Sequence, residues 1–62
     1  MKKLNLDPNI NNVDEFYAQL LAAHEGLSEA DSEALNARLI LILANHIGDL
    51  STLVQAIHSA KS

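Results

Sequence analysis

The most demanding feature of this sequence is an uninterrupted apolar segment, residues 39–44, inside a longer stretch with helical periodicity. A helix that is apolar on every side needs cover on every side, because water is an unfavourable environment for apolar surface. The one short helical segment that precedes it offers too little surface to cover it. We therefore expect part of this surface to contact another chain. The candidate interface residues are Leu39, Ile42, Leu43 and Ile47.

The length and composition of the chain restrict how it can be stabilised. Its 62 residues permit one domain with a small core, and it contains no cysteine, so disulfides cannot reinforce that core. Apolar residues make up 48% of the sequence, but Phe16 and Tyr17 are the only aromatics. Packing by leucine, isoleucine and alanine favours helices over a β-sheet. Helix packing or association with another chain is then the remaining source of stability.

Capping signals mark the first two helices. Asn12 with Glu15 and Ser28 with Asp31 have the spacing of N-terminal capping boxes, and Gly26 suits the residue after a helix C-terminus. The short connection between these helices predicts antiparallel neighbours, a helical hairpin. The predicted elements are an irregular arm at residues 1–12 and, in a single helical domain of residues 13–62, helices near 13–25, 29–47 and 50–60.

The boundary between the second and third helices rests on two opposing signals. Apolar residues keep helical spacing across Gly48, which favours one continuous helix. Weak helix formers nevertheless cluster around this glycine, with a summed penalty of roughly 3–4 kcal/mol relative to alanine. Gly48 also suits a helix end and Asp49 a helix start. We therefore predict an all-α fold, a helical hairpin or three-helix bundle broken at Gly48, with a continuous helix as the alternative.

The charge pattern restricts the partners. The net charge is −4, and Arg38 is the only lysine or arginine between Leu4 and Ala60. An acidic chain is unsuited to nucleic acid and to anionic membrane surfaces. No apolar run is long enough to span a bilayer, so we expect a soluble, cytoplasmic protein. Because Arg38 borders the apolar segment, we expect its guanidinium to be paired.

A polar strip accompanies the apolar segment. On one continuous helix Arg38, Asn45 and Asp49 would lie along a single edge, with His46 beside them. One interpretation is a hydrogen-bonded strip that fixes helix packing, and the other is a surface that binds a partner chain or an acidic ligand. The three histidines have no spacing suited to a metal site. We expect no metal, no cofactor and no catalytic residue.

The strings N-A-R-L at residues 36–39 and A-N-H-I-G-D at residues 44–49 are specific. With Phe16, Tyr17 and the segment at residues 24–28, they resemble a small bacterial family catalogued as domain of unknown function 2783. The resemblance spans residues 4–60 and implies a short, cytoplasmic, all-α protein without an established activity. It also implies genes close to those of flavin-dependent aromatic hydroxylases, which suggests a metabolic protein as one kind of partner.

Two functions are compatible with these sequence features. The first is a non-enzymatic helical interaction module, which either self-associates as a dimer or serves as a small accessory subunit of a larger, metabolic protein. The alternative is a small-ligand-binding or catalytic helper protein that uses the polar strip at an oligomer interface, because so short a chain does not enclose a pocket alone. A helix-turn-helix DNA-binding protein fits the outline of three helices but not the negative charge.

Overall fold

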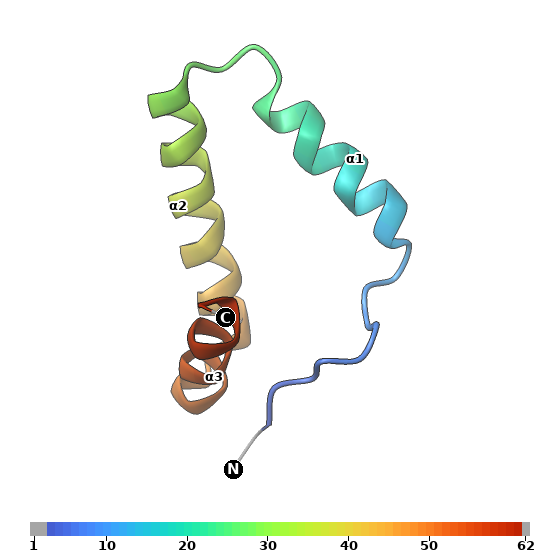
Figure 1. Cartoon of the computed structure of the whole chain (residues 1–62), viewed down its shortest axis with the longest axis vertical. Helices are drawn as coiled ribbons and strands as arrows, with labels where there is room; N and C mark the ends of the chain where they lie inside the picture. Colours follow the sequence, from blue (N-terminus) through green and yellow to red (C-terminus); the bar gives the residue numbers. More distant parts are fainter. Residues whose placement is uncertain (1–2, 62) are drawn as a thin grey trace.

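The computed structural model describes residues 3–61 and contains three helices in that range, without a strand (Figure 1). The helices are α1 (Val13–His24), α2 (Glu29–Ile47) and α3 (Leu50–Ala60). The predicted all-α fold is therefore confirmed, with a break at Gly48 in place of the alternative continuous helix.

Side-chain caps begin the first two helices. The Oδ1 atom of Asn12 accepts a hydrogen bond of 3.3 Å from the backbone N–H of Glu15, and Asn12 itself has φ 56°. Asparagine tolerates this left-handed conformation better than most residues. Ser28 Oγ accepts a bond of 3.1 Å from the Asp31 N–H at the start of α2. Both predicted caps are confirmed, and they fix where α1 and α2 begin.

The α2–α3 junction combines a helix stop with a helix start. Gly48 has φ 74°, and its N–H donates to the carbonyl oxygen of Ala44 at 2.8 Å. Asp49 Oδ2 then accepts two hydrogen bonds from Thr52, one from the backbone N–H at 2.9 Å and one from the hydroxyl at 2.6 Å. A left-handed residue followed by a capped helix start changes the chain direction, so α2 and α3 are separate helices.

The helices are spread apart. Figure 1 shows α1 and α2 diverging from their connection, and the three helices make only sparse contacts with one another. No residue described by the structure is buried. The radius of gyration is 13.4 Å, whereas a compact chain of this length has about 10.6 Å. Residues 3–61 therefore form no fully buried core.

The N-terminal arm returns from the far end of α1 toward α3 (Figure 1). The backbone N–H of Leu4 donates to Gln55 Oε1 of α3 at 3.3 Å, and Leu4 is half-buried. Leu6 is 77% exposed. Of the two leucines in the arm, only Leu4 lies against the helical part of the chain.

Gly48→Ala should destabilise the protein by about 1 kcal/mol, because an L-residue in the left-handed conformation is strained. A Cβ atom at Gly48 would lie 3.7 Å from the carbonyl oxygen of Asn45, an ordinary contact, so the cost is conformational. Gly48→Asn should cost less, since asparagine tolerates this conformation. Urea unfolding at a fixed protein concentration measures both variants. A Gly48→Ala protein more stable than the parent would contradict the break.

Candidate functional site

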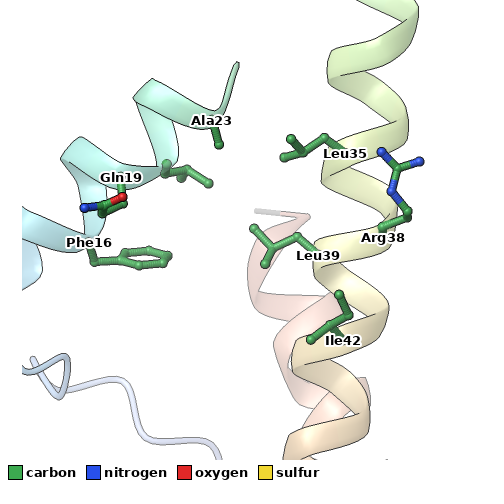
Figure 2. Close-up of a pocket in the computed structure, with 8 residues that line it drawn as sticks. Phe16, Gln19, Ala23, Leu35, Arg38, Leu39 and Ile42 are labelled. Carbon is green, nitrogen blue, oxygen red and sulfur yellow. The ribbon is translucent and has the colours of Figure 1, made fainter. Parts of the chain in front are cut away.

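An apolar groove lies between α1 and α2. It has a volume of about 360 Å³ and is open to solvent. Figure 2 shows Phe16 pointing from α1 toward α2, and Leu35 and Leu39 pointing from α2 toward α1. The lining residues are Phe16, Gln19, Leu20 and Ala23 from α1, and Leu35, Arg38, Leu39 and Ile42 from α2.

The groove is built from two stripes of matching spacing. Phe16, Leu20 and Ala23 on α1 occupy positions i, i+4 and i+7, so they share one helix face. The second stripe, on α2, has the same spacing and comprises Leu35, Leu39 and Ile42. Each stripe covers the other only in part, because none of its members is fully buried. The groove therefore has room for a third apolar surface.

The predicted interface residues divide into two pairs. Leu39 and Ile42 line the groove, whereas Leu43 and Ile47 lie outside it and are exposed on α2. The α1 side of the groove was absent from the predicted set. Its signal was present in the helical spacing of the α1 apolar residues, but spacing alone does not reveal which faces of two helices meet.

One side-chain hydrogen bond joins α1 to α2 within residues 3–61. The Nε2 atom of His24 lies 2.7 Å from Asn36 Oδ1, and its Nδ1 atom lies 2.7 Å from the carbonyl oxygen of Leu20 in the same helix. Sequence reasoning did not foresee this link. It satisfies the polar side chain of Asn36 on α2, and it fixes α1 beside α2 close to their connection.

Both neighbours of the His24 ring are oxygen atoms, which accept hydrogen bonds and so favour the doubly protonated ring. The Leu20 carbonyl oxygen is the larger influence and the Asn36 side chain the smaller. Together they raise the pKa of His24 above its ordinary value of 6.5, and partial desolvation opposes them. The charged form of His24 is thus the form that ties the two helices most firmly.

The polar strip is divided between two helices. Arg38 and Asn45 lie on α2, where both are exposed, and so is His46 in its last turn. Asp49 lies beyond the end of α2, is half-buried and caps α3. The helix edge that Arg38 and Asn45 share therefore does not extend to Asp49. A binding role for these four residues stays a prediction.

The expected intrachain partner of Arg38 is not found. Within the described part of the chain its side chain makes neither an ion pair nor a hydrogen bond. Figure 2 shows its guanidinium lying along α2 at the edge of the groove, turned away from α1. An exposed guanidinium is solvated by water, so Arg38 needs no partner within its own chain. Pairing of Arg38 with another chain stays a prediction.

The chemistry available at this site is mainly apolar. Across residues 3–61, no group of three or more histidine, cysteine, aspartate or glutamate side chains is placed to hold a metal ion. None of the helices in this range combines the length and apolar character that crossing a membrane requires. A groove lined by leucine, isoleucine and phenylalanine suits the apolar face of a helix.

Fold and groove together define a small all-α protein with uncovered apolar surface. The chain belongs to the family described as a protein of unknown function (DUF2783), which matches residues 4–62. The resemblance noted from the sequence is thereby confirmed. No curated protein and no solved structure matches the chain.

The His24–Asn36 link predicts a pH-dependent stability. Because the folded-state pKa of His24 is raised above 6.5, its contribution is complete below that pH and is lost as pH rises through the folded-state value. The stability difference between the parent and His24→Gln should therefore be larger near pH 5.5 than near pH 8. Urea unfolding measures the difference, and an NMR titration of the ring gives the pKa directly.

His58→Gln is the matched control, because the His58 ring makes no hydrogen bond within the described residues. That variant should show no comparable pH-dependent difference. A His24 stability difference that is equal at the two pH values, or larger at the higher one, would contradict the proposed charge state of the link.

Arg38→Ala should change the free energy of unfolding by less than about 0.5 kcal/mol, as is usual for an exposed residue without a partner. Urea unfolding at a fixed protein concentration measures the change. A loss of about 1–3 kcal/mol would instead show that Arg38 has a buried hydrogen-bonding partner, which another chain would have to supply.

Proposed function

We propose that this chain is a non-enzymatic helical interaction module, acting in the cytoplasm, whose core is completed by another protein chain. That chain is either a second copy or a larger protein for which this one serves as a small accessory subunit. The observation that carries the proposal is the absence of any buried residue within residues 3–61. Apolar residues make up 48% of the sequence, and leaving most of their surface in contact with water is unfavourable.

The accessible surface area of the chain is larger than that of a compact monomer. The chain exposes 5525 Å², whereas a compact monomer of its mass exposes roughly 3,900 Å². The excess of about 1,600 Å² exceeds the roughly 800 Å² that each partner contributes to a standard interface. Most large apolar side chains of all three helices contribute to this surface. The uncovered area is therefore large enough for a stable protein–protein interface.

The nature of the surface favours a protein partner. The groove between α1 and α2 is mainly apolar, with Gln19 and Arg38 as its polar lining residues, and helical proteins receive an apolar helix face in grooves of this kind. The net charge of −4 and a single exposed arginine at the groove edge offer no basic surface for a nucleic acid. Capture of an amphipathic helix needs no catalytic group, and apolar contacts supply the affinity.

A ligand-binding or catalytic helper protein is the second candidate, and one observation favours it. Arg38 has no ion-pair or hydrogen-bond partner within the described residues, so its guanidinium is available to a carboxylate on a ligand or on another chain. The proposed sites are Arg38, Asn45, His46 and Asp49. Weighing against it, Asp49 is already engaged in capping α3 and the four residues do not share one helix edge.

Association should be visible in two measurements on the purified chain. Sedimentation equilibrium between about 1 and 100 µM should give a mass above the 6.7 kDa of one chain. Helicity by circular dichroism should fall on dilution, because folding linked to association depends on concentration. If the chain instead needs a larger partner, it should be monomeric, weakly folded and bind a hydrophobic dye. A cooperatively folded monomer with no concentration dependence would refute the proposal.

A further inference from the structure

We propose that the occupant of the α1–α2 groove is α3 of a second copy, seated through Leu50, Val54 and Ile57. In a symmetric dimer each copy would then receive the other's α3. This inference rests on the proposed function, because it names the partner of the groove. The proposed function requires only that the chain associates, whereas this inference specifies which two surfaces are in contact.

The α3 stripe matches the groove in spacing and chemistry. Leu50, Val54 and Ile57 occupy positions i, i+4 and i+7, as do the two stripes that line the groove. The stripe and each side of the groove therefore extend about 10.5 Å along their helices. The segment Leu50–Ala60 contains no aspartate, glutamate, lysine or arginine, so no charged α3 side chain is desolvated when it enters the groove. Three stripes of equal length can pack as three adjacent helices.

The same α3 does not fill the groove of its own chain. Only Gly48 and Asp49 connect α2 to α3, and α3 turns its half-buried residues, including Leu53 and Ala56, toward the rest of its own chain. The hydrogen bond from Leu4 to Gln55 adds the N-terminal arm to α3. The apolar stripe is left partly exposed, with Leu50 74%, Val54 39% and Ile57 58% exposed.

Area and size both support a second copy. Two open chains expose twice 5525 Å², while a compact body of twice the mass exposes roughly 6,500 Å². Association would bury about 4,500 Å², inside the roughly 2,000–5,000 Å² of obligate dimers. A compact body of twice the chain length also has a radius of gyration near 13.7 Å, close to the 13.4 Å of one open chain. The radius of gyration of one open copy is thus similar to that expected for a compact dimer.

Symmetry explains why the assembly would stop at two. Each copy has one groove and one α3 stripe. A twofold axis therefore pairs each groove with the stripe of the other copy, and no groove or stripe is left unoccupied. The charged side chains lie outside both surfaces, apart from Arg38 at the groove edge. The acidic net charge of the two copies then stays in solvent.

Disulfide trapping tests the contact directly, because the chain contains no cysteine of its own. Leu39→Cys lies at the centre of the α2 stripe and Val54→Cys at the centre of the α3 stripe, so the test is independent of helix direction. Mixed under oxidised glutathione, the two single variants should form a mixed disulfide. Leu41→Cys is the matched control, since Leu41 is an exposed leucine of α2 outside the groove. Its mixed disulfide with Val54→Cys should form at least about tenfold more slowly.

The double variant Leu39→Cys with Val54→Cys distinguishes a contact between two chains from a contact within one chain. A reciprocal dimer gives cross-linked pairs of chains, whereas closure of α3 into its own groove gives a cross-link within one chain. An intrachain product at high dilution, with no mixed disulfide between the single variants, would overturn the inference.

Complementation provides a second test. Leu39→Asp damages only the groove and Val54→Asp only the stripe, so each variant alone should dimerise at least tenfold more weakly. An equimolar mixture should recover much of the lost association, because one intact groove then meets one intact stripe. Variants that dimerise normally, or a mixture that recovers nothing, would overturn this inference while leaving the proposed function standing. A parent chain that is a stably folded monomer would instead remove the proposed function.

Discussion

The structure depends on a surplus of apolar surface that the described part of the chain leaves largely uncovered. The apolar segment at residues 39–44 presents leucine and isoleucine on every side of α2, while α1 and α3 are each shorter than α2. Packing either short helix against α2 covers one side at most. The result is a chain with well-capped helices and no buried residue among those described.

The difference between local and tertiary interactions explains which features the sequence could predict. The caps at Asn12, Ser28 and Asp49, with the glycine at the end of α2, are interactions between near neighbours, so residue type and spacing were enough to place the helix boundaries. The His24–Asn36 link could not be found in this way. It depends on the angle between two helices, which no local pattern specifies.

The candidate site was also predicted only in part from the sequence. Leu39 and Ile42 were predicted as interface residues from the density of apolar side chains, and they do line the groove. The α1 side of the groove and the α3 stripe became apparent only when the helices were placed in space. Arg38 makes no ion pair within the described residues, because its side chain is exposed in the single chain, which the sequence alone could not show. A high density of apolar residues predicts that a helix needs a packing surface, but it does not predict which residues provide that surface.

The absence of a core has a consequence for the lifetime of the chain in a cell. In a protein with a packed interior, proteases reach the backbone only after rare cooperative opening, whereas helices with little tertiary cover open locally and often. A solitary copy would therefore be degraded quickly when cleavage follows the population of open forms. If the chain assembles as proposed, the partner would cover its helices and slow this cleavage. Turnover would then match the abundance of this chain to that of whatever covers its helices, without any dedicated regulator.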